Sequence, residues 1–174
     1  LRITHQDLEE SRREDVESRH AQYPPIDQVI AGALRRDGSL WMRRPEHPEF
    51  LKFRLGQGTD IARVTIEGAD QRSGLPEAIA RVRALADEYS RVAHVPLVAD
   101  LRASGGLGLC GPADILRQAR GAIAAQLAAQ YSPAEVIVTC LTSAERVDGW
   151  EWMKWLPHSS SPHSPFGSGI HLAS

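Results

Sequence analysis

Residues 105–115 read Gly-Gly-Leu-Gly-Leu-Cys-Gly-Pro-Ala-Asp-Ile, the pattern of a strand, a glycine turn and the start of a helix. The helix is predicted to run from about 113 to 130, with an apolar stripe at helical spacing. That stripe consists of Leu116, Ala119, Ile123 and Leu127. A nearly continuous apolar run at 135–141 follows, as expected of a parallel strand covered on both faces. These segments predict a βαβ unit with a right-handed crossover.

The glycine turn has the spacing of a phosphate-binding loop without its chemistry. In the pattern G-x-x-x-x-G-K-[ST] the lysine reaches the phosphates and the hydroxyl binds Mg²⁺. The best overlay runs from Gly106 to Gly111 and ends in Pro112 and an alanine. Pro112 lacks a backbone N–H, and Asp114 in the first helical turn would repel an anion. We therefore expect a degenerate nucleotide site at Gly106, Gly108 and Gly111, and no catalytic residue.

A charged helix is predicted at 5–22. The pairs Glu9–Arg13 and Asp15–Arg19 stand four residues apart and support it locally. Its apolar stripe is thin, which suits a stalk or connector more than a buried helix. Tyr23-Pro24-Pro25 ends the helix, because the residue before a proline disfavours the α region.

The remaining elements predict an α/β fold with a mainly parallel sheet and flanking helices. We expect a stalk helix over 1–23 and one domain over 24–174. Further helices are expected at 26–36 and 76–90, and short strands at 40–43, 50–55, 61–66, 97–101, 107–110 and 170–173.

Composition narrows the classes of partner. The net charge of −2 gives no general argument for binding nucleic acid. No stretch approaches the 18 or so apolar residues of a membrane span.

Cys110 and Cys140 are expected to be reduced core thiols. His158, His163 and His171 lack a defined ligand spacing, so no metal site is expected. The two ends of the sequence suggest a piece of a longer protein.

Several side chains have two possible roles, packing within the fold or contact with a partner. Trp150, Trp152 and Trp155 either cover the sheet or form an interface, since tryptophan is enriched at binding hot spots. Arg43 and Arg44 either belong to a solvated, ion-paired face or contact a neighbouring domain. His158 precedes a serine-rich loop and is a further interaction candidate. Asp100 is expected to bond its own backbone in a turn, the alternative being contact with a ligand.

Taken in order along about 24–174, several segments resemble the EccC/EssC-type membrane ATPases of type VII (ESX) secretion, in the FtsK/SpoIIIE superfamily. The most specific is the string Trp-Glu-Trp-Met-Lys-Trp-Leu-Pro-His at 150–158. The others are LWMRRP at 40–45, FLKFRLG at 50–56, PLVADL at 96–101, the turn at 108–111 and YSPAEV at 131–136.

The resemblance implies a juxtamembrane stalk and a first, divergent domain that is P-loop-NTPase-like but degenerate. It implies a parent chain that uses ATP and Mg²⁺, exports small helical proteins, and has transmembrane helices before residue 1. The expected place is the cytoplasmic face of the cell inner membrane. The expected partners are other subunits of the secretion complex, the neighbouring ATPase domains and further copies of the chain, but not nucleic acid.

Within that superfamily the strand after the SPxxV turn ends in an acid, whereas here it ends in Leu141-Thr142-Ser143. We therefore expect a domain that couples ATP-driven motion to the secretion channel without hydrolysing ATP. Two alternatives stay open: an atypical site that binds and hydrolyses ATP, and part of an FtsK-like DNA translocase.

Overall fold

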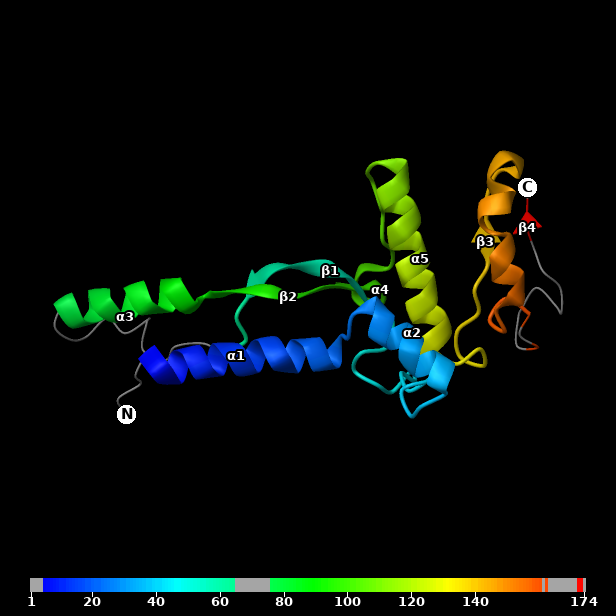
Figure 1. Ribbon diagram of the computed structural model, residues 1–174. Coiled ribbons are helices and arrows are strands. Elements are labelled where there is room, and N and C mark those ends of the chain that lie inside the picture. The colour runs from blue at the N-terminus through cyan, green and yellow to red at the C-terminus, as the bar shows by residue number, and fades with distance from the viewer. Residues whose placement is uncertain (1–4, 65–75, 161, 163–171, 174) are drawn as a thin grey trace. The chain divides into compact units, whose positions relative to one another are not determined.

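The computed structural model describes residues 5–64, 76–160, 162 and 172–173 (Figure 1). The chain forms two compact units. Unit 1 comprises Leu1–Pro24 and Arg54–Ala99, and unit 2 comprises Pro25–Phe53 and Asp100–Ser174. The borders between them fall within two strands, β1 (Lys52–Ile61) and β2 (Arg91–Asp100). The division into a stalk over 1–23 and a domain over 24–174 stays a prediction.

Unit 1 contains helix α1 (His5–Gln22) and helix α3 (Pro76–Tyr89), both at the predicted places. Of the two predicted charge pairs in α1, Asp15–Arg19 is present at 2.8 Å, whereas Glu9 pairs with Arg12 at 3.9 Å. The less exposed face of α3 consists of Ile79, Val82, Leu85 and Ala86, which follow one another at helical spacing. Of the strand expected at 61–66, only Ile61 is in a strand, as the last residue of β1. Residues 62–64 are not in a strand, and residues 65–66 lie outside the described residues.

Unit 2 is built around helix α2 (Ile26–Arg35), helix α5 (Ala113–Gln130) and a group of aromatic rings. α2 packs against α5, and Val29 and Gly32 are its buried residues. Gly32 faces the turn after α2, where a Cβ atom would meet the Ser39 hydroxyl at 2.7 Å. The centres of the Phe50 and Phe53 rings lie 5.6 and 5.5 Å from that of Tyr131, the residue that ends α5. Phe53 and Tyr131 are completely buried. These contacts make Tyr131 the centre of the core of unit 2.

The rest of unit 2 consists of short elements. Helix α4 (Leu101–Ser104) follows β2, and the 3₁₀ helices η1 (Ala144–Gly149) and η2 (Glu151–Trp155) follow strand β3 (Cys140–Leu141). β3 pairs with strand β4 (Leu172–Ala173) in parallel, with Cys140 opposite Leu172. No described helix has the length and apolar character that crossing a membrane requires.

The described residues do not form the predicted mainly parallel sheet. β1 and β2 form an antiparallel pair, with Ala62 N–H bonded to the Ser90 carbonyl at one end and Leu101 N–H to the Leu51 carbonyl at the other. Residues 40–43, 107–110 and 135–139 are not strands. The physical reason is that a β-branched apolar run becomes a strand only where a second backbone accepts its hydrogen bonds. The amide of Val138 instead donates to the His158 carbonyl at 3.1 Å.

Candidate functional site

The glycine loop is open on all sides. Residues 105–111 are exposed, and a Cβ atom added at Gly106, Gly108 or Gly111 would meet nothing within 4 Å. Gly105 adopts φ 71°, a left-handed conformation that ends α4 and that glycine adopts without strain. The loop then leads through Pro112 into α5, whose N-cap has no side-chain hydrogen bond. The predicted strand–turn–helix is therefore an extended loop followed by a helix.

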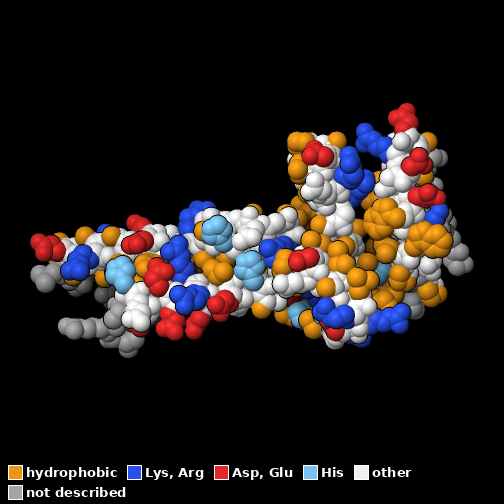
Figure 2. Space-filling view, in the orientation of Figure 1, with side chains coloured by type: hydrophobic (Ala, Val, Ile, Leu, Met, Phe, Trp, Pro, Cys, Tyr) orange, Lys and Arg blue, Asp and Glu red, His pale blue; other side chains and the backbone are white. Residues whose placement is uncertain are grey.

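Beside the end of this loop lies a groove of about 580 Å³, which we call the α5–η1 groove. Its lining comes from Gly111, from the first two turns of α5, and from the segment that runs from the end of β3 to the start of η2. The complete set is Gly111, Ala113, Leu116, Arg117, Arg120, Leu141, Thr142, Arg146 and Trp150. Figure 2 shows the notch between α5 and the η1 segment, with basic, acidic and hydrophobic side chains around it. The groove thus brings together Gly111 and Thr142, the two places where a nucleotide site would carry its polar groups.

Arginine determines the charge of the α5–η1 groove. Three of its lining side chains are arginines and none is a carboxylate. Arg120 is fixed in position: its Nη2 donates to the Gly149 carbonyl at 3.2 Å, and its guanidinium lies 4.2 Å from the centre of the Trp150 ring. Arg117 and Arg146 form no side-chain hydrogen bond or ion pair with another described residue. The groove is therefore a cationic hollow with two uncommitted guanidinium groups.

Sequence reasoning missed these arginines. Arg117 and Arg120 stand three residues apart on one helix, so they share a face, and that spacing was available as a signal. Arg146 gave no comparable signal, because it joins the groove only through the fold of residues 141–150.

Arg43 and Arg44 have different surroundings. Arg43 is only 4% exposed; its amide donates to the Gln130 carbonyl at 3.0 Å and its Nη1 to the Lys52 carbonyl at 2.8 Å. Arg44 is exposed and lies 3.3 Å from the Glu135 carboxylate. The expected solvated, ion-paired face therefore describes Arg44, whereas Arg43 connects the end of α5 to the start of β1 inside unit 2.

The three tryptophans of 150–155 differ in exposure. Trp150 is half-buried against Arg120, and Trp152 donates to the Gly149 carbonyl at 3.2 Å. Trp155 is 79% exposed, while Met153 between them is buried. Trp155 is thus the member of the group whose ring is most available to a partner.

His158 is completely buried. Its Nε2 lies 2.7 Å from the Tyr131 carbonyl, and its Nδ1 has no hydrogen-bond partner among the described residues. Burial lowers the pKa of His158, and the bond to Tyr131 only partly opposes this. In this position His158 ties the end of α5 to the segment after η2, and nothing reaches it from solvent.

Asp100 bonds its own backbone as expected: its carboxylate accepts from the Ala103 amide at 2.9 Å and caps α4.

Neither of the two cysteines expected in the core is fully buried. Cys140 is half-buried, whereas Cys110 is exposed because the loop that carries it packs on nothing. Among the described residues no three His, Cys, Asp or Glu side chains gather closely enough to hold a metal. His163 and His171 lie outside the described residues.

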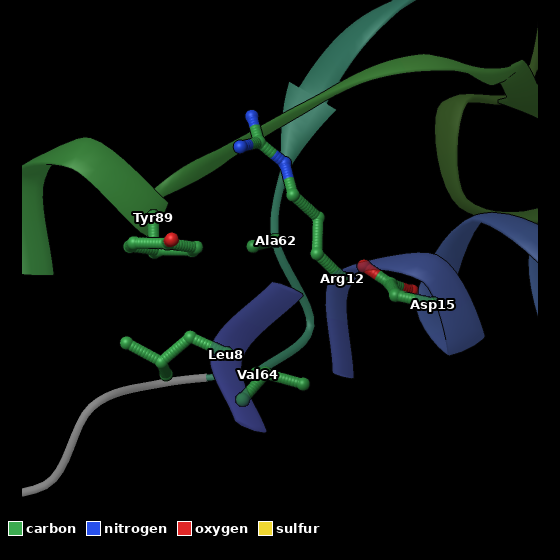
Figure 3. Close-up of a pocket in the computed structure, with 6 residues that line it drawn as sticks. All are labelled: Leu8, Arg12, Asp15, Ala62, Val64 and Tyr89. Atoms are coloured by element: carbon green, nitrogen blue, oxygen red, sulfur yellow. The ribbon is translucent and has the colours of Figure 1, made fainter. Parts of the chain in front are cut away.

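Unit 1 has a smaller cavity of about 20 Å³, between α1, α3 and the end of β1 (Figure 3). Tyr89 and Leu8 lie on one side of it and Asp15 on the other. The Tyr89 hydroxyl donates to Glu9 at 2.9 Å, and the Arg12 guanidinium lies 5.6 Å from the ring centre. A space of this size holds about one water molecule, so it is a packing feature and not a ligand site.

Comparisons with known proteins identify relatives over most of the chain. The ESX secretion system protein EccC of Geobacillus thermodenitrificans is 28% identical over 151 residues, 85% of this chain. ESX-4 secretion system protein EccC4 of Mycobacterium tuberculosis is 30% identical over 72% of the chain, and an EccC protein of Thermomonospora curvata is 32% identical over 71%. The chain spans about a tenth of the length of these relatives. No protein-family profile matches it.

Proposed function

This chain belongs to the EccC-type proteins of ESX secretion, and we propose that it is the membrane-proximal, ATPase-like part of a type VII secretion motor. In this proposal the parent protein hydrolyses ATP in other domains and exports small helical proteins. The parent works as a homo-oligomer with the other subunits of the secretion complex, at the cytoplasmic face of the inner membrane. The segment described here passes motion from the ATPase domains to the channel.

One observation is the main support for the proposal that this domain does not hydrolyse ATP. The positions that would hold the phosphate-binding lysine and the Mg²⁺-binding hydroxyl are Pro112 and Ala113, at the very start of α5. A proline and an alanine offer no side-chain group to a phosphate or a metal. Thr142, beside Gly111 in the groove, stands where an acid would be needed. A domain without these groups is suited to coupling and not to phosphoryl transfer.

The proposed stalk rests on the character of α1. The helix has few apolar residues, and its most buried positions include the charged Asp15 and Arg19. Transmembrane anchoring would come from the part of the parent chain that precedes residue 1. A DNA translocase is the less favoured alternative, because proteins that follow the DNA backbone are usually basic, whereas this chain has a net charge of −2.

A second candidate function is an atypical site that binds and hydrolyses ATP. It is favoured by one observation, the meeting of Gly111, Thr142 and three arginines in one groove. The two candidates differ in the release of phosphate from ATP by the chain itself. We expect no release above background with millimolar Mg–ATP; release that is lost on Arg117→Gln would favour the second candidate.

The coupling role is tested in the full-length motor. Replacing Pro24-Pro25 by Gly-Gly introduces flexibility directly after α1. We expect secretion to be lost while ATP hydrolysis by the purified full-length protein is retained. Replacing the exposed Gly38 by Ala, where a Cβ atom would meet nothing within 4 Å, is the control for a local backbone change. Undiminished secretion from the Gly-Gly variant would contradict a mechanical role for α1.

A further inference from the structure

We propose that the outer surface of the η1–η2 segment binds a basic stretch of another polypeptide, whose arginine or lysine side chains meet tryptophan rings and carboxylates there. This η1–η2 surface consists of Glu145, Asp148, Glu151, Trp152 and Trp155. The inference names the chemistry of one partner of the proposed motor component. Binding is measured without secretion, so its failure and a failure of the coupling role of α1 can be told apart.

The winding of the segment decides which of its side chains share a face. The amides of Trp150, Met153 and Leu156 each donate to the carbonyl three residues earlier, at 2.8, 2.9 and 3.0 Å. In such a 3₁₀ helix, side chains three residues apart lie one above the other. One row faces inward and is partly or fully buried, and it consists of Val147, Trp150, Met153 and Leu156. The other two rows of side chains therefore point outward.

The two outward rows differ in character, and together they make up the η1–η2 surface. One row carries three exposed acids, Glu145, Asp148 and Glu151. The neighbouring row carries the exposed rings of Trp152 and Trp155, while Arg146 at its start lines the α5–η1 groove. Figure 2 shows acidic and hydrophobic side chains next to one another over this segment. Exposed acids also occur on α1, but unit 1 has no tryptophan, so the combination and not acidity alone distinguishes this surface.

One cation already binds here in the manner proposed for the partner. The Lys154 ammonium pairs with Glu151 and lies 5.5 Å from the centre of the Trp155 ring. Ammonium and guanidinium groups are attracted to the negative face of an indole ring. The Trp155 ring is largely exposed, and the side chains of Glu145 and Asp148 form no ion pair or hydrogen bond with another described residue. The surface therefore has aromatic and acidic groups left for further cations.

The spacing of these groups suits a polypeptide. A 3₁₀ helix rises about 2 Å per residue, so neighbours in one row are about 6 Å apart and the surface is about 20 Å long. Every second side chain of an extended chain is separated by about 6.6 Å, and about six extended residues span the surface. A basic residue at every second position would therefore meet one carboxylate or ring each. Nucleic acid and anionic lipid are disfavoured, because the acidic row would repel their phosphates.

The test is binding of a fluorescein-labelled peptide of alternating arginine and serine residues to the 174-residue chain, followed by fluorescence anisotropy. We expect saturable binding that weakens as salt is raised. Trp155→Ala should weaken it about threefold or more by removing a ring, and Glu145→Gln with Asp148→Asn about fivefold or more by removing two charges. All three side chains are exposed, so the variants should keep the circular dichroism spectrum of the parent chain. Glu14→Gln with Glu17→Gln changes the net charge equally on α1 and should leave the affinity nearly unchanged.

Lys154→Gln should have the opposite effect and bind the peptide more tightly. Lys154 occupies the Glu151 carboxylate and the Trp155 ring, which the partner's cations would otherwise use. Arg13→Gln removes an equal charge from the exposed side of α1 and is the matched control. A purely structural role for η2 predicts no gain of affinity when Lys154 is lost.

Three results would overturn the inference. The first is no saturable binding, or binding that neither the Trp155 substitution nor the two acid substitutions weaken. The second is equal binding of a peptide of alternating glutamate and serine, because such binding would not depend on opposite charge. The third is equal weakening by the acid substitutions on η1 and on α1, which would assign the binding to net charge alone. The coupling role of α1 is tested separately, by secretion.

Discussion

Unit 1 holds its first helix in place with charged groups, whereas unit 2 builds its core from aromatic rings. In unit 1 the buried Asp15 and Arg19 bond each other at 2.8 Å, and Arg19 also donates to Asp60 and to the Ile61 carbonyl. In unit 2 the rings of Phe53 and Tyr131 are fully buried and in contact. On the face shown in Figure 2, charged side chains of both signs are spread over α1, and hydrophobic ones gather over unit 2.

This difference bears on what each unit can do. Burying an apolar ring contributes stability directly, whereas a buried ion pair contributes little net stability and mainly fixes one arrangement of its partners. We therefore expect unit 2 to be the more stable scaffold for the α5–η1 groove. Unit 1 is expected to keep α1 in one register by polar contacts.

The largest effect is expected from Phe53→Ala. Removing a fully buried phenyl ring from contact with Tyr131 should cost about 3–5 kcal/mol in the free energy of unfolding. Urea unfolding followed by tryptophan fluorescence measures this, because all four tryptophans lie in unit 2. Leu34→Ala is the control: that side chain is 80% exposed, so its loss should cost less than about 0.5 kcal/mol. Equal costs for the two variants would contradict an aromatic core.

Asp15→Asn should have a slightly smaller effect and act on unit 1. The substitution leaves Arg19 buried with only Asp60 as a charged partner, which should cost about 3 kcal/mol. Hydrogen exchange of the α1 amides is the measurement, with the exposed Glu14→Gln on the same helix as control. A change in tryptophan-detected unfolding as large as the change in α1 would show that the two units are not stabilised separately.

The Asp15 pair also predicts a dependence on pH. Burial alone would raise the pKa of Asp15, but the hydrogen bonds from Arg19 and the Arg63 amide, with the charges of both arginines, bring it below its usual value. An acid with a lowered folded-state pKa contributes stability that is present above its unfolded pKa of about 4 and is lost as pH falls through the folded pKa. The protection factors of the α1 amides, which correct for the intrinsic pH dependence of exchange, should therefore fall below that pH, and less so in Asp15→Asn.

Helices could be predicted from the sequence, and strand pairing could not. α1, α2, α3 and α5 lie where local spacing and prolines put them, since helical hydrogen bonds are made within the segment. The strands needed information that one segment does not contain. Residues 135–141 have the composition of a buried parallel strand, yet only Cys140–Leu141 pairs, with Leu172–Ala173. Composition reports burial, whereas a strand depends on where its neighbour lies.

The candidate site shows the same limit. The sequence alone shows that the lysine and the acid of a nucleotide site are missing, because both belong to fixed positions in a known pattern. The sequence did not show that the arginines line one groove, because only the fold brings Arg146 near Arg117. Arg43 was left open between a solvated face and a contact with a neighbouring domain, and His158 was an interaction candidate. Both lie buried, each bonded to a backbone carbonyl. Charged and aromatic side chains look alike in a sequence whether they face solvent or the core.

His158→Gln should have a smaller effect on stability, about 1 kcal/mol at pH 8, because glutamine can still donate to the Tyr131 carbonyl. The informative result is its pH profile. Burial lowers the pKa of His158, so the unfolded chain binds a proton first and the stability of unit 2 falls as pH drops below the ordinary value of 6.5. Tryptophan-detected unfolding at pH 8 and pH 5.5 should show this loss in the parent chain and not in His158→Gln. A loss of equal size in both would assign the effect to other groups.

Trp155→Ala should have the smallest effect on stability, less than about 0.5 kcal/mol, because its ring is 79% exposed. Its neighbour Met153 is buried, and Met153→Ala should cost about 2 kcal/mol or more. Within one short helix, Met153→Ala tests packing inside the fold and Trp155→Ala tests contact with a partner. If Trp155 meets a partner in the secretion complex, Trp155→Ala in the full-length motor should lower secretion without lowering the unfolding midpoint. Loss of secretion that simply follows stability, large for Met153→Ala and absent for Trp155→Ala, would leave η2 with a packing role alone.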